Sequence, residues 1–252
     1  MTTIVTGAGS GIGRATAELL LDGGEAVVGV DLDPERLTWL DAHERAAAVT
    51  GDVGSEETNA DMVSEALWHF GSLDALVLNA GISHIGPLEH TGPELIDRIL
   101  RVNLRSVALG LRAALPALLR AGNPAVVTVA SISGLQGEPA MGLYAASKGG
   151  VVNLTRSAAV ELGPRGIRVN CVCPGPTLTG MAAPVLAARP EIGERLRRNV
   201  PLKRLAQPIE VARVIRFLIS PAASFVHGAV VPVDGGITAN VGQYPPPDPG
   251  GS

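Results

Sequence analysis

Short runs of β-branched and small apolar residues alternate with longer amphipathic stretches along almost the whole chain of 252 residues. The seven strand-like runs are Thr2–Thr6, Ala26–Val30, Ala46–Thr50, Ala75–Leu78, Ala125–Ala130, Arg168–Val172 and Val230–Val233. The stretches with helical periodicity are residues 12–23, 34–43, 55–70, 93–120, 142–162 and 208–219. The short runs are apolar on both faces, which is typical of parallel strands covered by helices. The alternation therefore predicts an α/β fold with a doubly wound, mostly parallel, seven-stranded sheet and helices on both faces.

The chain shows no internal repeat and no Ser/Gly linker, and its 46% hydrophobic residues are enough for one large core. We therefore expect a single domain over residues 1–240. Five prolines interrupt the alternation in residues 174–206, and we expect a mobile lid over the site at about 178–206. The proline-rich tail, residues 241–252, is expected to be extended or disordered.

Charge and cysteine content narrow the class of protein further. The net charge of −4 gives no basic excess for a nucleic-acid partner. We see neither a signal peptide nor an apolar stretch long enough to span a membrane, so we expect a cytoplasmic protein. Cys171 and Cys173 lie two residues apart in a predicted strand. We expect them to point to opposite faces as reduced, buried thiols, and we expect no metal site, because two cysteines are too few for a usual zinc site.

A glycine-rich turn, Gly7-Ala8-Gly9-Ser10-Gly11-Ile12-Gly13, directly follows the first predicted strand. The glycines allow a tight turn and a close approach of the backbone to a pyrophosphate. The helix that begins here offers free N–H groups and the positive end of its dipole. In a βαβ unit this turn predicts a dinucleotide-binding site, with Gly7, Ser10, Gly11, Ile12 and Gly13 as cofactor-binding residues.

Asp31 ends the second strand, 24 residues beyond Gly7. A carboxylate at this place can accept hydrogen bonds from the ribose hydroxyls of adenosine. It would repel a 2′-phosphate, since two like charges about 4 Å apart near a surface repel by roughly 4 kcal/mol. We therefore expect NAD rather than NADP as the cofactor. Arg14 and Arg36 keep NADP open, because either is close enough in sequence to reach a phosphate.

Four further residues indicate acid–base chemistry. Tyr144 and Lys148 are four residues apart in a predicted helix and so share one of its faces. A neighbouring ammonium and a positive nicotinamide ring both favour the phenolate form of a tyrosine. Ser131 lies at the end of the fifth strand, where strand ends and helix starts meet at the ligand crevice. Asn103 lies in the middle of the long predicted helix, where an asparagine is mildly unfavourable without a role.

The glycine spacing G-x-x-x-G-x-G and the Asn103, Ser131, Tyr144, Lys148 set resemble the short-chain dehydrogenase/reductase family from about Thr3 to Thr238. The resemblance implies a Rossmann fold with strand order 3-2-1-4-5-6-7 and a homotetramer, with a dimer as the alternative. It also implies that Tyr144 is the acid–base group and that Ser131 holds the substrate oxygen. Lys148 would hold the nicotinamide ribose, and Asn103 would order a water in a proton relay.

The resemblance assigns cofactor contacts at three further strand ends. Asp52 and Val53 would lie along the adenine, although Asp52 has a second interpretation as a helix cap. The segment Asn79-Ala80-Gly81 would back the cofactor and brace the sheet. The loop with Pro174, Gly175, Thr177 and Thr179 would bind the nicotinamide carboxamide and the phosphates, although Thr179 also fits a helix cap.

These observations predict an oxidoreductase that moves a hydride between NAD(H) and a secondary alcohol or ketone, with a small, diol or cyclic substrate. Its pocket is expected to be lined by Ile82, Ser83, His84, Ser133, Gln136–Met141 and the lid. One alternative is an NADPH-dependent 3-oxoacyl-thioester reductase, which Asp31 and Ser10 disfavour. Another is a dinucleotide-binding regulator without turnover, which the intact catalytic set disfavours. Extended sugar epimerases share Tyr-x-x-x-Lys but usually carry a larger substrate domain.

Overall fold

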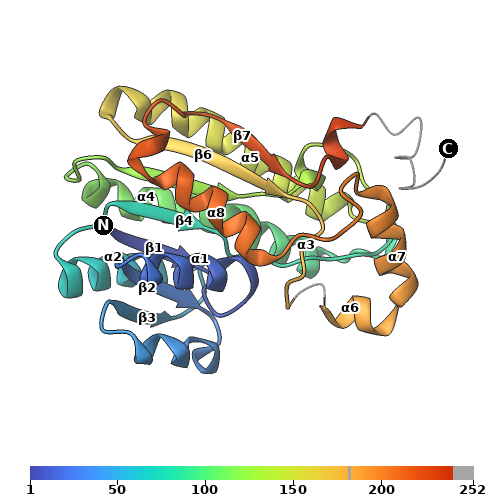
Figure 1. The fold of residues 1–252 in the computed structure, drawn as a ribbon, viewed down its shortest axis with the longest axis horizontal. Helices are drawn as coiled ribbons and strands as arrows, with labels where there is room; N and C mark the ends of the chain where they lie inside the picture. Colours follow the sequence, from blue (N-terminus) through green and yellow to red (C-terminus); the bar gives the residue numbers. More distant parts are fainter. Residues whose placement is uncertain (181–182, 241–252) are drawn as a thin grey trace.

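The structure, a computed structural model, describes residues 1–180 and 183–240. A seven-stranded sheet in the order β3-β2-β1-β4-β5-β6-β7 lies at the centre of the described residues (Figure 1). The strands are β1 (Thr2–Thr6), β2 (Ala26–Asp31), β3 (Ala46–Thr50), β4 (Ala75–Leu78), β5 (Ala125–Val129), β6 (Arg168–Pro174) and β7 (Val230–Val233). Every neighbouring pair is parallel. The predicted fold class and strand order are confirmed.

Helices connect the strands and cover both faces of the sheet (Figure 1). The α-helices are α1 (Gly11–Asp22), α2 (Glu56–Phe70), α3 (Pro93–Leu100), α4 (Ser106–Leu118), α5 (Gly142–Leu162), α6 (Ala183–Ala188), α7 (Pro190–Asn199) and α8 (Pro208–Ile219). The 3-10 helices are η1 (Pro34–Ala42), η2 (Leu88–His90), η4 (Ile132–Gly134), η5 (Gly163–Arg165), η6 (Pro221–Ala223) and η7 (Ile237–Ala239), and η3 (Arg101–Arg105) is a π-helix.

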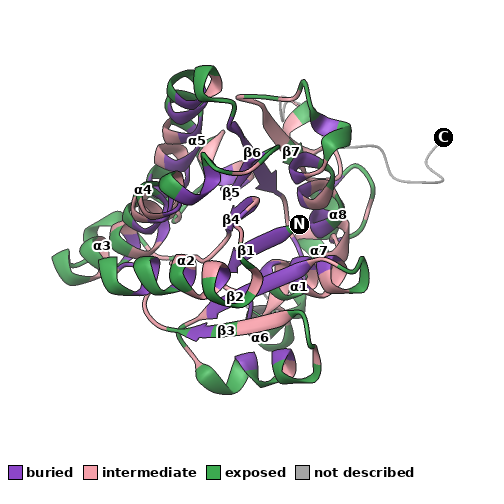
Figure 2. Cartoon of the chain, turned by 90° about the vertical axis from the view of Figure 1, so that its left-hand side faces the viewer, coloured by how far each residue is buried: buried purple, intermediate pink, exposed green. Residues whose placement is uncertain are grey.

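Two apolar cores lie on opposite faces of the sheet. Neighbouring residues of β1 show the division, because Ile4 packs with α2, α4 and α5 whereas Val5 packs with α1, η1 and α8. Strand side chains alternate between the faces, so a strand that is apolar throughout serves both cores. Figure 2 shows buried central strands and helices whose outer sides are exposed. The edge strands β3 and β7 are only partly buried, because each has a neighbour on one side alone.

Two predicted helices differ from the observed ones. The stretch 93–120 is divided into α3, the π-helical turn η3 and α4. The stretch 34–43 is the 3-10 helix η1, which the side chain of Asp33 caps by accepting a hydrogen bond from Glu35 N. Apolar periodicity reports which face is buried, and it does not distinguish α-helical from π-helical or 3-10 turns.

The expected orientation of the two cysteines is wrong. The Sγ atoms of Cys171 and Cys173 lie 3.9 Å apart in the core beneath α5, on one face of β6. Side chains alternate along a strand with a period of two, so residues i and i+2 share a face. Both residues are buried free thiols, as expected.

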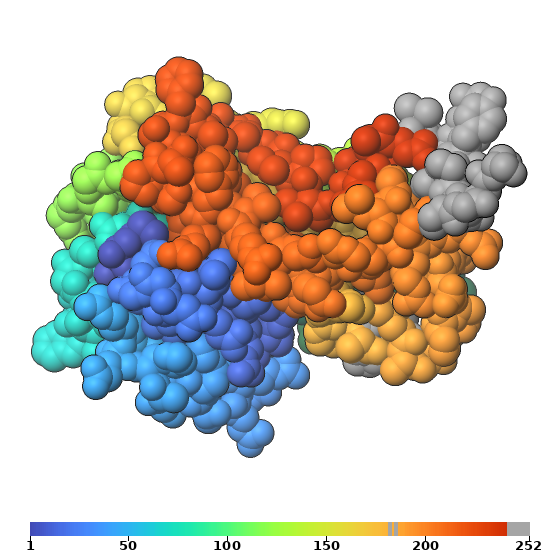
Figure 3. Space-filling model, in the orientation of Figure 1, coloured from blue at the N-terminus to red at the C-terminus, as the bar shows by residue number. Residues whose placement is uncertain are grey.

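Helices α6 and α7 pack against each other beyond the carboxyl ends of the strands (Figure 1). The space-filling view shows the surface hollowed between these helices and the N-terminal elements (Figure 3). Among the residues the structure describes, no helix is long and apolar enough to cross a membrane. The predicted tail, residues 241–252, lies outside the described residues.

Candidate active site

The glycine-rich turn has a tight backbone conformation that favours glycine. Gly7 and Gly11 have φ angles of +70° and +55°, a region that favours glycine. A Cβ atom on Gly13 would lie 2.2 Å from the carbonyl oxygen of Gly7, so α1 packs directly onto the turn. Ser10 is the N-cap of α1 in extended conformation, and Ile12 packs against the core beneath. The first turn of α1 therefore presents backbone N–H groups toward the carboxyl edge of the sheet.

Asp31 lies immediately beneath this turn. Its Oδ2 atom accepts a hydrogen bond of 3.0 Å from Gly9 N. The two arginines that kept NADP open are both paired with carboxylates near them in the chain. Arg14 binds Glu18 at 2.8 Å, and Arg36 binds Asp33 at 3.1 Å.

The predicted adenine loop is held by the π-helical turn. Arg101 of η3 pairs with the Asp52 carboxylate, which also accepts a hydrogen bond of 2.7 Å from Gly54 N. Val53 is buried. The interpretation of Asp52 as a helix cap is wrong, because Ser55 caps α2 by accepting a hydrogen bond from Thr58 N.

The segment after β4 is hydrogen-bonded to the end of β1. Asn79 Nδ2 donates to the carbonyl oxygen of Thr6 at 2.9 Å, and Thr6 Oγ1 accepts from the N–H groups of Asn79 and Ala80. This geometry braces β1 against β4. A Cβ atom on Gly81 would lie 3.2 Å from Lys148 Nζ, so Gly81 leaves room for the ammonium. Thr6 was missed in the sequence, where it appears only as the last residue of a strand.

Tyr144 and Lys148 lie one turn apart near the start of α5, and Ser131 precedes η4 at the end of β5. Lys148 Nζ is 6.0 Å from the centre of the Tyr144 ring and donates a hydrogen bond of 2.9 Å to the carbonyl oxygen of Val129. Ser131 lies close enough to Tyr144 for its hydroxyl to lower the pKa of the phenol. The structure therefore brings these three predicted residues together at one end of α5.

Burial dominates the pKa values of this group. It raises the pKa of the Tyr144 phenol, as do the nearby Glu138 and Cys173, whereas the Ser131 hydroxyl lowers this pKa. Burial also lowers the pKa of Lys148 to about 8. The expectation that the ammonium makes the phenol more acidic is wrong for the protein alone. Lys148 is not among the groups that shift the pKa of the phenol, and the loss of hydration, which opposes the charged form, has the largest effect on this pKa.

Asn103 lies in the π-helical turn, and both hydrogens of its side-chain amide are donated within the protein. Its Oδ1 atom accepts from Ile82 N at 2.8 Å, and Nδ2 donates to Ile82 O at 2.9 Å and to Ser147 Oγ at 3.0 Å. Ser147 in turn donates to the carbonyl oxygen of Tyr144 at 2.7 Å. Ser147 thus connects Asn103 with α5. The sequence shows it only as the residue before Lys148.

The loop after β6 closes over the glycine turn. Pro174 ends β6, and Gly175 N donates to Val233 O at 3.0 Å. Thr177 Oγ1 donates to Gly175 O at 2.9 Å. A Cβ atom on Gly11 would lie 3.2 Å from the side chain of Thr179, which places this threonine against the turn.

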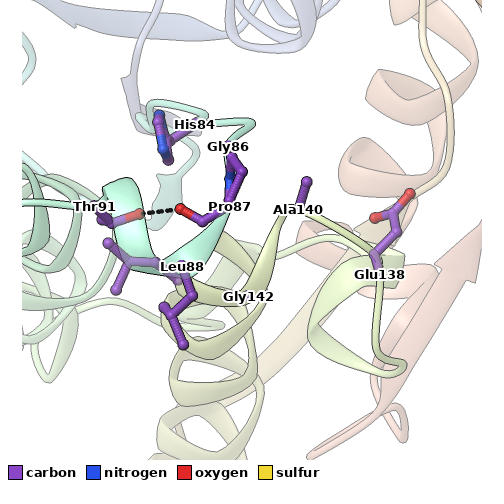
Figure 4. Close-up of a pocket in the computed structure, with 9 residues that line it drawn as sticks. His84, Gly86, Pro87, Leu88, Thr91, Glu138, Ala140 and Gly142 are labelled. Atoms are coloured by element: carbon purple, nitrogen blue, oxygen red, sulfur yellow. Dashed lines mark hydrogen bonds between the residues drawn. The ribbon is translucent and has the colours of Figure 1, made fainter.

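A cavity of about 340 Å³ opens beside the start of α5 (Figure 4). It is lined by His84, Gly86, Pro87, Leu88, Thr91, Glu138, Ala140, Gly142 and Leu143. Three of these residues, His84, Glu138 and Ala140, were expected in the pocket, whereas η2 was not. Figure 4 shows Glu138 on the side of the cavity opposite His84 and Thr91. In the described part of the chain, no cluster of His, Cys, Asp and Glu side chains could hold a metal ion.

A family model described as enoyl-(acyl carrier protein) reductase matches residues 7–238. The chain belongs to the short-chain dehydrogenase/reductase family. It is 44% identical to cis-4-hydroxycyclohexanecarboxylate dehydrogenase of Sinomonas cyclohexanicum, over 94% of this chain and 96% of that one. It is 39% identical to cyclopentanol dehydrogenase of Comamonas testosteroni, over 94% and 96% of the two chains. The solved structure of levodione reductase superposes with a TM-score of 0.89 at 35% identity, covering 96% of this chain and 98% of that one.

As a short-chain dehydrogenase/reductase, the chain is an oxidoreductase. The match begins at Gly7 and so includes the glycine turn, and it ends beyond β7. Apart from Thr6 at the end of β1, every residue of the candidate site that is described above lies within it.

Proposed function

We propose that this protein transfers a hydride between NAD(H) and a secondary alcohol or ketone, with a small, diol or cyclic compound as substrate. The observation that carries this proposal is the meeting of Ser131, Tyr144 and Lys148 between the glycine-turn edge and the cavity. The names of two relatives, which are dehydrogenases of cyclic secondary alcohols, support this substrate class.

The residues present fit a dinucleotide. The open backbone at Gly7, Gly11 and Gly13 suits a diphosphate at the start of α1, where any Cβ atom would meet strain or a clash. The other proposed contacts are Ser10, Ile12, Asp31, Asp52, Val53, Asn79, Ala80, Gly81, Tyr144, Lys148, Pro174, Gly175, Thr177 and Thr179. When bound, the nicotinamide supplies the hydride acceptor or donor.

We propose NAD rather than NADP. The Asp31 carboxylate lies under the turn where the adenosine ribose would bind, and a 2′-phosphate there would meet its negative charge. Arg14 and Arg36 are paired with Glu18 and Asp33, so a phosphate would have to compete with two ion pairs.

In the oxidation, the Ser131 hydroxyl donates a hydrogen bond to the substrate oxygen, and the Tyr144 phenolate accepts one from the substrate hydroxyl. Tyr144, as the phenolate, accepts the alcohol proton while the carbon loses its hydride. Lys148 favours the phenolate once its ammonium faces a water-poor site, because the attraction between opposite charges grows as the dielectric falls. Lys148, together with a water that Asn103 would order, returns the proton toward solvent. In the reduction, Tyr144 donates the proton and Ser131 stabilises the developing negative charge on oxygen.

A panel of secondary alcohols and ketones, each with NAD(H) and NADP(H), tests the proposal through the absorbance of the reduced nicotinamide. We expect NAD-dependent turnover of cyclic or vicinal-diol substrates and its loss in Tyr144→Phe. Activity that survives this substitution would rule out the proposed mechanism. Acyl thioesters belong in the panel because of the name of the matching family model, and a preference for them with NADPH would favour the reductase alternative. Cofactor binding without any turnover would favour a regulator.

We further propose that residues 1–240 form one domain, that residues 178–206 act as a lid, and that the protein is a cytoplasmic homotetramer, with a dimer as the alternative. Two exposed apolar side chains support an assembly: Val160 of α5 is 80% exposed, and Phe225, before β7, is fully exposed. Light scattering after size exclusion measures the number of subunits.

A further inference from the structure

The wall of the cavity beside α5 has an unbalanced charge. Its lining is mostly apolar, with His84 and Thr91 on one side and Glu138 on the other (Figure 4). Within the described part of the chain, none of the lining residues is a lysine or an arginine. The wall therefore carries a carboxylate that no lysine or arginine on the same described wall offsets.

The neighbours of Glu138 do not neutralise its charge. The residue is exposed, and its Oε2 atom accepts a hydrogen bond from Ser133, whose hydroxyl is uncharged. Among the described residues, no lysine or arginine forms an ion pair with Glu138. Lys148 does not line the cavity, and its Nζ atom donates to Val129 O. A ligand that enters the cavity therefore meets a negative charge.

An anionic substrate group would lose hydration in this cavity and would also be repelled by the carboxylate. Two like charges about 4 Å apart weaken binding about fivefold even at the dielectric constant of water, and more near a protein surface. We propose that the cavity selects uncharged secondary alcohols and that Glu138 excludes carboxylates, sulfonates and phosphates. This inference rests on the proposed function, because it takes the cavity as the place of the substrate, and it narrows the substrate class.

Two cyclic alcohols of almost equal size test this selection. They are cis-4-hydroxycyclohexanecarboxamide and cis-4-hydroxycyclohexanecarboxylate, which share the reacting carbon and differ in charge. The readout is the ratio of their kcat/KM values with NAD at low salt and about pH 9, at which free imidazole is uncharged. Glu138 also raises the pKa of Tyr144, but this effect acts on both substrates and cancels in the ratio. We expect the wild-type protein to prefer the amide by about fivefold or more.

Three substitutions assign the selection to a residue. Glu138→Gln keeps the shape and an acceptor for Ser133 but removes the charge, and it should lower the ratio about fivefold. Glu138→Lys reverses the charge and should lower the ratio further, by a similar factor. Glu89→Gln, on exposed η2 beside the same cavity, removes a charge that is not on the wall and should leave the ratio near that of the wild type. Because Glu138 is exposed, its variants should fold, and their melting curves check this.

Ionic strength separates repulsion between charges from a steric effect. The Debye length falls from about 30 Å at 0.01 M to about 3 Å at 1 M, so salt screens an exposed carboxylate. Over this range the wild-type ratio should fall toward the ratio of Glu138→Gln, whereas the ratio of Glu138→Gln should change little. Steric exclusion of the carboxylate compound would persist at high salt.

Three results would overturn the proposal. They are a wild-type protein that uses the carboxylate as well as the amide, a ratio that Glu138→Gln leaves unchanged, and an equal fall of the ratio in Glu89→Gln. Failure of the proposed function looks different: neither compound is turned over, or Tyr144→Phe retains the turnover. In that case, calorimetric titration of both compounds into the protein with saturating NAD gives the ratio of their Kd values, to which the same expectations apply.

Discussion

At the scale of single residues, the burial of the Lys148 ammonium lowers the stability of the folded protein. Its side chain is 4% exposed, and burial lowers its pKa from 10.5 to about 8. The folded state therefore binds the proton less tightly than the unfolded chain does. Below about pH 8 the ammonium is buried in its charged form, and this burial destabilises the fold.

We expect Lys148→Met to abolish turnover and yet stabilise the cofactor-free protein at pH 7. The lowered pKa corresponds to about 3 kcal/mol, and the lost hydrogen bond to Val129 offsets about 1 kcal/mol, which leaves a gain of about 2 kcal/mol. The wild-type protein loses this proton from the folded state first, so the gain should shrink between pH 8 and 10.5. Urea unfolding at both ends of this range measures it. A variant less stable than the wild type at pH 7 would contradict the argument.

Ser147 offers a second expectation at this scale. Ser147→Ala leaves one hydrogen of the buried Asn103 amide without its acceptor, which costs about 1–2 kcal/mol of unfolding free energy. It also releases Asn103 from α5, so kcat should fall severalfold. Thermal unfolding and initial rates measure the two effects. Ser157→Ala, an exposed serine on the same helix, is the control, and equal behaviour of both variants would show that the connection to Asn103 has no role.

At the scale of elements, the end of α8 depends on a side chain from a strand. The guanidinium of Arg168, the first residue of β6, donates to the carbonyl oxygens of Leu218, Ile219, Ser220 and Ala223. The last carbonyls of a helix lack partners within it and carry partial negative charge. Arg168 therefore both caps α8 and fastens it to the sheet.

We expect Arg168→Met to lower the free energy of unfolding by about 3 kcal/mol, because several buried carbonyl groups lose their donor at once. Arg213→Met, an exposed position on α8, should change it by less than about 0.5 kcal/mol. Chemical denaturation of both variants tests this. If the two losses were equal, the interactions of Arg168 would not stabilise the helix end.

At the scale of the whole molecule, the candidate site joins segments that are far apart in the sequence. The glycine turn follows β1, Asp31 ends β2, and Ser131, Tyr144 and Lys148 follow β5, all at the carboxyl edge of one sheet. Ligands of open parallel sheets bind at this edge, because the loops that follow alternate strands leave a crevice there.

A bound cofactor should therefore raise the stability of the entire fold. A ligand at 100 times its Kd stabilises the native state by about 2.7 kcal/mol. We expect NAD to raise the Tm more than NADP at equal concentration, and Asp31→Asn to narrow this difference because its side chain keeps an acceptor but loses the charge. Differential scanning fluorimetry measures both shifts. An equal or larger shift with NADP would contradict the role of Asp31.

The helices and strands could be predicted because the spacing of apolar residues along the chain shows which segments form each and which of their faces are buried. The seven apolar runs became the seven strands with small shifts at their ends, and α5 and α8 begin and end where their patterns do. The glycine turn and the Tyr144–Lys148 spacing are also local features, since a turn and one helical repeat fix their geometry within a few residues.

The remaining features depended on contacts between distant segments. The π-helical turn at Asn103 coincides with hydrogen bonds to Ile82 and Ser147, which lie 21 and 44 residues away. The raised pKa of Tyr144 reflects burial by several elements together. The hydrogen bond from Ser133 to Glu138 depends on how the loop after β5 folds back. The sequence by itself determined which elements form and which chemical groups they carry. Only the tertiary structure decided the environment of those groups, because desolvation and hydrogen-bond partners are set by atoms brought together in space.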